Sequence, residues 1–378
     1  MPSAADTQWI VDRAKSLGFD LCGVVRAEKF PELERFAEWL ACGYAGEMSY
    51  LADARRANPQ QTMPEIHSVI VCLLNYNTAH PLSTDPRLPS SEEEPRGWIS
   101  RYAWGRDYHD VLREKLNAVV EFLPQRFTEQ FEARAYVDTG PLHERVLAKY
   151  AGLGWIGKNT LLLNHSLGSF FFLGAILTTL NLEPTLRPGE MPPPDLCGNC
   201  RQCLDACPTG AFVEPYLMDA RKCISYLTIE LRGSIPEELR EPMGLNVFGC
   251  DICQDVCPWN RQAAVTAIPD FQPRAIASQK NPHDDKSALP HDESLLLPRL
   301  EWLARLSEAE FREVFRGSAI KRTKWRGLVR NACIALGNSD VPRGTPGHAR
   351  ICAVLEQLAA SEEKTLAESA LWALTRIQ

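Results

Sequence analysis

The sequence has no long hydrophobic run and no excess of basic residues, and both absences narrow its possible roles. The longest apolar stretch, FFFLGAILTTL at 170–180, is about half as long as a membrane-spanning helix. The first residues, MPSAADTQWIVDRAKSLGF, carry a charge every few positions, unlike a signal peptide. The net charge of −7 does not favour nucleic-acid binding by the surface as a whole. We therefore expect a cytoplasmic protein with no membrane partner.

Cysteine, by contrast, is abundant and unevenly placed. Of 13 cysteines in 378 residues, eight lie between Cys197 and Cys257. The other five stand in scattered, mostly apolar settings and are interpreted as small buried hydrophobic residues: Cys22, Cys42, Cys72, Cys333 and Cys352. In a reducing compartment, a local group of cysteines indicates metal ligation and not disulfide bonds.

The first run of cysteines, CGNCRQCLDACP, has the spacing C-x2-C-x2-C-x3-C-P. Bacterial two-cluster ferredoxins share it, and the fourth cysteine there binds the other cluster. The second run, CDICQDVCP, lacks one cysteine, and Cys223 is the single cysteine between the two runs. Crossing the runs gives two sets of four: Cys197, Cys200, Cys203 and Cys257 for the first cluster, and Cys207, Cys223, Cys250 and Cys253 for the second.

Two zinc sites would also use four thiolates each. The C-x3-C-P ending, which occurs twice, is typical of iron–sulfur proteins, so we predict two [4Fe–4S] clusters. A simple ferredoxin needs far fewer residues, and the rest of the chain is expected to hold a second cofactor that receives the electrons.

Hydrophobic periodicity divides the chain into three regions. Residues 1–183 are predicted to be mixed α and β, with helices over 7–19, 32–44 and 109–127, strands over 20–25, 68–76 and 131–138, and one or two strands over 168–180. Thr7 is a candidate helix cap. Residues 184–268 hold the cysteines, and residues 269–378 begin with an irregular stretch. The segment 79–97, rich in Pro, Ser and Glu, is predicted to be a solvated loop.

The C-terminal region contains two helical patterns, 326–338 and 366–377. Aligning Ala332 with Ala370 also aligns Leu336 with Leu374, a spacing of 38 residues. Such a period suggests a short HEAT-like array, and the alternative is two unrelated amphipathic helices. Before and within the first helix lies a basic run without any acidic residue. It includes Lys321, Arg322, Lys324, Arg326 and Arg330. It indicates an RNA or phosphate partner, or else only a solvated face.

The segment GLGWIGK at 152–158 matches G-x-G-x-x-G, but a helical pattern precedes it where a nucleotide loop requires a strand. We expect instead a tight loop that places Lys158 and Asn159 beside an anionic or amide-bearing group. A cobalamin motif D-x-H-x-x-G fails at Leu112.

Together, YVDTGPLHERVLAKYAGLGWIGKNTLLL, RYAWGRDYHDVL, the cysteine runs and RGLVRNACIALGN resemble the epoxyqueuosine reductase family over nearly the whole chain. The resemblance implies an α+β chain of three parts: a nitroreductase-like cobalamin-binding domain (1–183), a ferredoxin-like domain with two [4Fe–4S] clusters (184–268) and a C-terminal HEAT-like helical domain that holds tRNA (269–378). The implied reaction reduces the epoxide of epoxyqueuosine, at the wobble position of tRNA, to an alkene. The loop at 79–97 is longer than the family leads us to expect.

The resemblance also implies site residues. Asp138, at the end of a predicted strand, is the expected acid for the departing oxygen, since a carboxyl in an apolar pocket can remain protonated near neutral pH; the alternative is a turn-capping aspartate. The expected cobalamin contacts are Arg56, Arg101, Asp138, Lys158 and Asn159. Tyr102 and His109 are further pocket candidates.

The expected partners are tRNA with a GUN anticodon and an external low-potential electron donor, and we expect a monomer. Two other classes compete with this interpretation. A reductive-dehalogenase-like enzyme would leave the basic run and the helical tail without a purpose. An electron carrier or RNA-binding scaffold would leave the N-terminal domain unexplained.

Overall fold

The protein was analysed as a computed structural model, which describes residues 3–86, 88, 93–276 and 293–377. An antiparallel four-stranded sheet, in the order β1-β2-β7-β4, organises the N-terminal half. Its strands are β1 (Leu21–Arg26), β2 (Ser68–Asn75), β7 (Phe171–Thr178) and β4 (Ala133–Tyr136). All eight residues of β2 are buried, as its unbroken apolar sequence predicts for a central strand. Residues 168–180 form one strand and not two.

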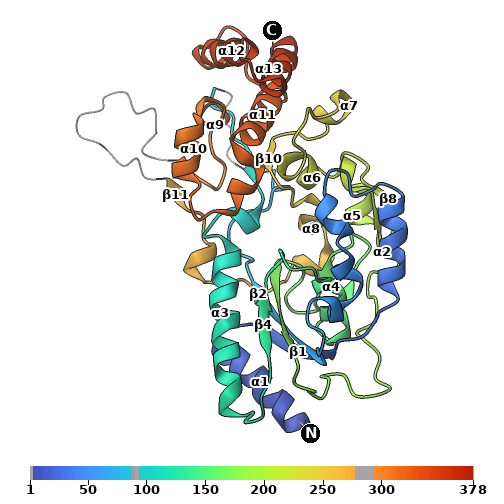
Figure 1. The fold of residues 1–378 in the computed structure, drawn as a ribbon. Helices are drawn as coiled ribbons and strands as arrows, with labels where there is room; N and C mark the ends of the chain where they lie inside the picture. The colour runs from blue at the N-terminus through green and yellow to red at the C-terminus, as the bar shows by residue number, and fades with distance from the viewer. Residues whose placement is uncertain (1–2, 87, 89–92, 277–292, 378) are drawn as a thin grey trace, which may run out of the picture.

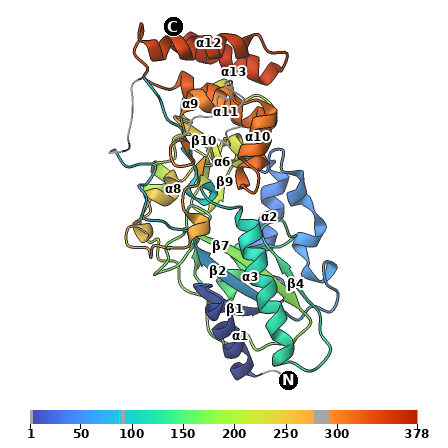
Figure 2. The same ribbon diagram turned by 90° about the vertical axis from the view of Figure 1, so that its left-hand side faces the viewer.

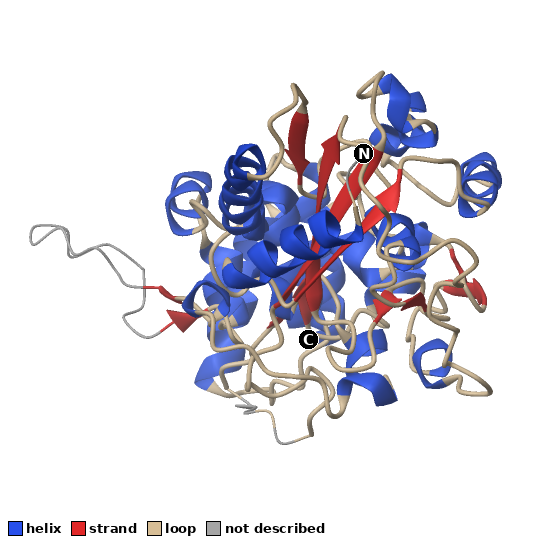
Figure 3. Ribbon diagram, turned by 90° about the horizontal axis from the view of Figure 1, so that it is seen from below, coloured by secondary structure: helices blue, strands red, loops and turns tan. Residues whose placement is uncertain are grey.

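Helices cover both faces of this sheet (Figures 1 and 3). Alternate residues of β2 pack against α1 (Ala4–Ser16) and α3 (Tyr108–Phe122) on one face, and against α4 (Glu144–Tyr150) on the other. Helix α2 (Glu32–Ala41) was also expected from the sequence. The cap assigned to Thr7 is wrong: the helix begins after Ser3, and the buried Thr7 hydroxyl donates to the Glu183 carbonyl at 2.6 Å.

The cysteine region is built from short elements. They are α5 (Gln202–Asp205), β8 (Phe212–Glu214), β9 (Leu217–Met218), α6 (Ile224–Ile229), α7 (Glu237–Arg240), β10 (Asn246–Phe248) and α8 (Ile252–Asp255). Two small strands of the N-terminal half, β5 (Trp155–Ile156) and β6 (Leu162–Leu163), form a hairpin beside it.

The C-terminal helices form the upper part of the molecule in Figures 1 and 2. They are α9 (Leu300–Arg305), α10 (Glu308–Val314), α11 (Lys324–Gly337), α12 (Pro346–Ala359) and α13 (Lys364–Ile377). Helix α11 is buried along most of its length. Both predicted helices are therefore confirmed, and the HEAT-like description stays a prediction.

Part of the first region in sequence packs with the last region in space. Strand β3 (Trp98–Ile99) pairs in parallel with β10, and Trp98 and Trp104 pack into the core of the C-terminal helices. Strands β11 (Ala275–Ile276) and β12 (Glu293–Ser294) pair with each other. The rest of the irregular stretch and part of the loop at 79–97 lie outside the described residues. Within the described ranges, no helix is both long and apolar enough to cross a membrane.

Candidate functional site

The first predicted set of thiols lines one cavity. Cys197, Cys200, Cys203 and Cys257 surround about 220 Å³ together with Leu163, Leu196, Trp259 and other residues. The chain brings them together because α5 and α8 pack against each other. Burial, and then the three neighbouring thiols, raise the pKa of Cys203 to about 11. Four soft thiols crowded around one small cavity suit a bound iron–sulfur cluster.

The second set gathers around Cys223, which comes directly before α6. Burial, followed by the charges of Cys223 and Cys207, raises the pKa of Cys250. Burial, followed by the charges of Cys250 and Cys223, raises the pKa of Cys253, and Cys203 of the first set also contributes. Cys223 and Cys250 both pack against the same small apolar cluster, and the assignment of Cys223 to the second iron–sulfur cluster stays a prediction.

Neither set converges on a single point. Among the described residues, no group of three or more Cys, His, Asp or Glu side chains is arranged to hold one metal ion. A [4Fe–4S] cube binds each thiolate at a different corner, so its ligands stand further apart than those of one tetrahedral ion.

Asp138 lies just after β4 and has a left-handed backbone, with φ of 52°. Its carboxylate accepts a hydrogen bond of 2.7 Å from the Tyr108 hydroxyl and lies 3.6 Å from Nε2 of His109. The other ring nitrogen of His109 contacts Asp107 at 2.7 Å, and Asp107 in turn pairs with Lys321 at 2.9 Å. A chain of polar contacts thus joins the sheet domain to the basic run.

In this conformation the pKa of Asp138 is not raised, and its role as the acid stays a prediction. Desolvation by the surrounding protein acts to raise its pKa, but the hydrogen bonds from His109 and Tyr108 outweigh it, and the net pKa is lowered. The side chain is still 65% exposed to water, so no closed apolar pocket surrounds it here. The proton resides instead on His109: burial lowers the pKa of this imidazole, but Asp107 and Asp138 more than offset the burial and raise the pKa to about 9.

Tyr108, Asp107 and Glu144 were not expected from the sequence to belong to this site. Tyr108 and Asp107 stood within the D-x-H motif that was tested only for cobalt ligation. Glu144, the first residue of α4, has a pKa raised to about 8, mainly by burial and next by the charge of Asp138. One of its carboxyl oxygens and Nε2 of His143 are buried without a hydrogen-bond partner among the described residues. Such unpaired polar atoms fit a large amide-bearing ligand like cobalamin.

Arg56 lies at the same site, and Arg101 does not. The Arg56 guanidinium donates to the Leu142 carbonyl at 3.0 Å and lowers the pKa of His143 after the larger effect of burial. Arg101 is 2% exposed, and its guanidinium donates to the carbonyls of Thr78, His80 and Pro81. Its terminal nitrogens are used internally, which corrects the expectation that they contact cobalamin.

Lys158 and Asn159 line the first thiol cavity. The Lys158 ammonium donates to the carbonyls of Gly198 and Cys200, and the Asn159 amide to that of Cys253 at 3.4 Å. A helix, α4, precedes this loop, which confirms the reason for rejecting a nucleotide loop. Contact of these two residues with cobalamin stays a prediction.

Tyr102 joins the second thiol set to Asp138. Gly249, next to Cys250, packs against Ser100 and the Tyr102 ring. The Tyr102 ring meets that of Tyr108 edge to face at 5.8 Å, and the Tyr108 hydroxyl reaches Asp138. We call the second set of thiols the inner set because Tyr102 links it to Asp138, and the first set the outer one; the path of electrons between them stays a prediction.

The basic run divides into three kinds of residue. Lys321, Arg322 and Arg326 are exposed and paired with Asp107, Glu230 and Glu363. Lys324 is exposed and has no ion-pair partner in the described ranges. Arg330 is only 1% exposed, and its guanidinium is bound to the carbonyls of Leu227, Leu231 and Gly233. Arg330 cannot reach a phosphate, which corrects its predicted role.

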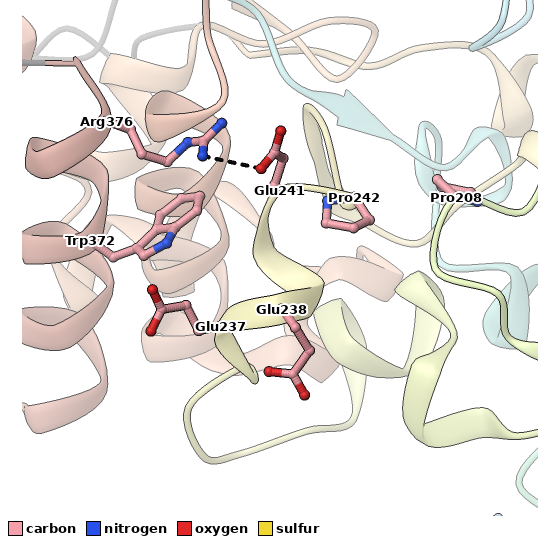
Figure 4. A pocket seen from close by; sticks show the side chains of 7 residues that line it. All are labelled: Pro208, Glu237, Glu238, Glu241, Pro242, Trp372 and Arg376. Carbon is pink, nitrogen blue, oxygen red and sulfur yellow. Dashed lines mark hydrogen bonds and ion pairs between the residues drawn. The ribbon is translucent and has the colours of Figure 1, made fainter.

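A larger and more open cleft of about 750 Å³ lies between α7 and α13. Figure 4 shows its lining, in which Glu237 lies near Trp372, Glu238 points away from that ring and Arg376 pairs with Glu241. Three carboxylates repel phosphate, so this cleft does not suit a nucleic acid.

Two family models match the chain. One is described as a 4Fe-4S double cluster binding domain and matches residues 196–260. The other is described as epoxyqueuosine reductase QueG, DUF1730, and matches residues 56–139. The first spans both cysteine runs. The second begins at Arg56 and ends at Thr139, directly after Asp138.

Similar proteins cover nearly the whole chain. The epoxyqueuosine reductase of Gloeobacter violaceus is 43% identical over 89% of this chain and 97% of its own length. That of Pseudomonas aeruginosa is 40% identical over 98% of this chain and 94% of its own. The Escherichia coli enzyme is 39% identical over 95% and 86%, respectively.

Solved structures agree with these relatives. A crystal structure of epoxyqueuosine reductase with an epoxyqueuosine-modified stem loop of tyrosine tRNA superposes with a TM-score of 0.81 at 31% identity, covering 98% of this chain and 89% of the other. A Bacillus subtilis epoxyqueuosine reductase, whose catalytic aspartate loop is swung out of the active site, gives a TM-score of 0.80 at 30% identity, over 98% and 90%.

Proposed function

Because the chain belongs to the epoxyqueuosine reductase family, we propose that Asp138, the two thiol sets and the basic run divide the work of its reaction. The enzyme is an oxidoreductase that reduces epoxyqueuosine in tRNA to queuosine, with loss of the epoxide oxygen as water. Its cofactors are those of the family, cobalamin and two [4Fe–4S] clusters. Its fold mixes helix and sheet, and we assign the three regions as nitroreductase-like, ferredoxin-like and HEAT-like.

One observation carries this division of roles: Asp138 and the basic run meet at the same place. Lys321 pairs with Asp107, which holds His109 against Asp138. The Arg322 guanidinium lies 5.3 Å from the centroid of the Tyr50 ring. The charge of Arg322 helps to lower the pKa of Asp138. Its effect is smaller than that of desolvation, which raises this pKa, and than those of the hydrogen bonds from His109 and Tyr108, which lower it. A tRNA held by the C-terminal helices would therefore present its modified base to Asp138.

We assign the outer cluster to Cys197, Cys200, Cys203 and Cys257, and the inner cluster to Cys207, Cys223, Cys250 and Cys253. Arg56, Asp138 and the unpaired atoms of His143 and Glu144 would border bound cobalamin. When bound, cobalamin supplies the electrons that open the epoxide.

Proton delivery falls to the chain's own residues. In the present conformation Asp138 is ionised and His109 holds the proton. A substrate base that covers the exposed carboxylate would remove it from water and raise its pKa. Asp138 would then take the proton of His109 and pass it to the departing oxygen. The aspartate-bearing catalytic loop of the Bacillus enzyme supports this role for a residue on a loop with a left-handed backbone.

The finer features of the partners are also part of the proposal. The tRNA would carry a GUN anticodon, the electrons would come from an external low-potential donor, and the enzyme would act as a cytoplasmic monomer. Anaerobic conversion of epoxyqueuosine-modified tRNA to queuosine, with bound cobalamin followed by its visible spectrum, tests the function directly. A protein that binds the tRNA but never converts it would contradict the proposal.

Cys223→Ala should remove the inner cluster and spare the outer one. Anaerobically purified wild-type protein is expected to hold about eight iron and eight sulfide per chain, and the variant about four of each. Iron and sulfide analysis measures both. Cys352→Ala is the matched control, because this cysteine lies on α12, where its thiol contacts the His348 ring. Full iron loading in the Cys223 variant, or zinc in the wild type, would refute the ligand assignment.

Lys324→Glu should weaken tRNA binding, since this exposed lysine is positioned to contact a phosphate. The plot of log affinity against log salt has a negative slope, and losing one phosphate contact reduces the magnitude of that slope by about 0.7 to 0.9. Binding of a tRNA stem loop at several salt concentrations measures the slope. Lys364→Glu, at the start of α13, is a charge-matched control. An unchanged slope in the Lys324 variant would mean that the residue is only part of a solvated face.

A further inference from the structure

The loop between β5 and β6 is the part of the sheet domain that enters the outer thiol cavity. Gly157 sits so close to Cys197 that a Cβ atom there would lie 3.4 Å from the sulfur and 2.4 Å from Leu163. The distance to the sulfur is an ordinary van der Waals contact, and it is the clash with Leu163 that favours glycine at this position. The tight loop that the G-x-G-x-x-G spacing predicts is thus used to wrap the cysteines.

Two N–H groups of this loop are directed at the same sulfur. Burial is the largest effect on the Cys197 thiol and raises its pKa, as does the Asp195 carboxylate, whereas the backbone N–H of Lys158 and the indole N–H of Trp155 lower it. Trp155 is only 3% exposed, and its indole N–H has no hydrogen-bond partner among the described residues. Trp155 packs with Leu163 and Cys257 in a small cluster that Cys197 also contacts, so a buried donor without an acceptor lies beside two predicted ligands of the outer cluster.

The Lys158 side chain adds a positive charge at the cavity mouth. Its ammonium holds the carbonyls of Gly198 and Cys200, two residues of the first cysteine run. It also lines the cavity with the cysteines. A cluster gains one negative charge on reduction, so nearby N–H donors and a cation favour the reduced form and raise the reduction potential.

We propose that Trp155 and Lys158 are positioning residues that set the reduction potential of the outer cluster, with Trp155 donating its indole N–H to the cluster or to the Cys197 sulfur. This inference rests on the proposed cluster assignment. It gives the loop at 154–159 a role in receiving electrons, separate from the chemistry at Asp138. The unpartnered indole lies in the apolar cluster that contacts Cys197, and the Lys158 ammonium holds two carbonyls of the first cysteine run.

Trp155→Phe tests the proposal because it removes the N–H and keeps an aromatic ring. One lost hydrogen bond to a charged acceptor should make reduction of the outer cluster about tenfold less favourable, which is about 59 mV for one electron. Anaerobic titration with dithionite and redox mediators, followed by EPR, measures each cluster. During this titration, dithionite supplies one electron to each cluster.

Trp259→Phe is the matched control. This residue lines the same cavity, and its ring meets that of Trp155 edge to face at 5.1 Å between centroids. Its backbone N–H lowers the pKa of Cys257, and the substitution leaves that group in place. The outer cluster of this variant should have the reduction potential of the wild type. Lys158→Gln should also lower the potential, and Lys158→Arg should restore it.

An unchanged potential in a Trp155→Phe protein with full iron content would overturn the proposal. So would an equal shift in the Trp259 control. If Lys158→Gln loses the cluster, the Trp155 comparison still decides the question. The titration needs no tRNA, so failure of this inference is distinguishable from failure of the proposed reaction, which would appear as absent turnover in the wild-type enzyme.

Discussion

Asp138→Asn should lower the turnover of epoxyqueuosine-modified tRNA about 10²- to 10⁴-fold, the usual cost of losing a general acid. Asparagine keeps the size of the side chain but cannot take a proton from His109 and pass it on. The backbone should accept the change, because asparagine tolerates the left-handed region in which Asp138 lies, with φ of 52°. The iron–sulfur cluster content, the cobalamin content and the affinity for tRNA should stay near wild-type values.

Single-turnover assays under anaerobic conditions, with iron and cobalamin measured on the same samples, separate this role from a structural one. A turn-capping aspartate would instead cost on the order of 1 kcal/mol of stability and leave the activity of each folded molecule mostly unchanged. Asp110→Asn is the control for charge removal, because this side chain on α3 is 46% exposed and pairs with Arg113. Near-normal turnover in a fully loaded Asp138→Asn protein would move the search for the acid to His109 or Tyr108.

Local pattern was enough to predict the elements of the sheet domain. The apolar run at 68–76 became the buried central strand β2, and the amphipathic run at 109–127 became α3. These segments have long, regular periods that tertiary contacts reinforce. The pairing of β3 with β10 was not predictable in this way, because strands of two and three residues far apart in sequence carry no periodic signal.

Cysteine spacing predicted the two thiol sets because ligand spacing follows cluster geometry directly. The roles of arginines were harder to predict, since an arginine has the same sequence signature whether its guanidinium faces water, phosphate or buried carbonyls. Arg101 and Arg330 were both expected to bind ligands, and both are internal donors. The contacts of Lys158 with the carbonyls of Gly198 and Cys200 also depend on tertiary structure, although the glycines before it predicted a tight loop.

Arg330→Met should destabilise the protein by about 3–5 kcal/mol, because it leaves several buried acceptors without a donor. The guanidinium serves the carbonyls of Leu227 and Leu231, between the cysteine region and α11. Burial lowers its pKa to about 10, so it stays charged at neutral pH and its hydrogen bonds remain charge-assisted. Methionine fills part of the space but donates nothing.

Arg326→Met, one turn earlier on α11, is the matched control for this variant. Arg326 is 63% exposed and pairs with Glu363 at 2.7 Å, and an exposed ion pair contributes only about 0–1 kcal/mol. Urea unfolding followed by circular dichroism measures both variants, and tRNA binding is measured on the fraction that remains folded. If Arg330 held phosphate, its loss would weaken tRNA binding and leave the free energy of unfolding unchanged. The buried carbonyl contacts require the opposite: a large loss of stability, with folded molecules that bind tRNA as the wild type does.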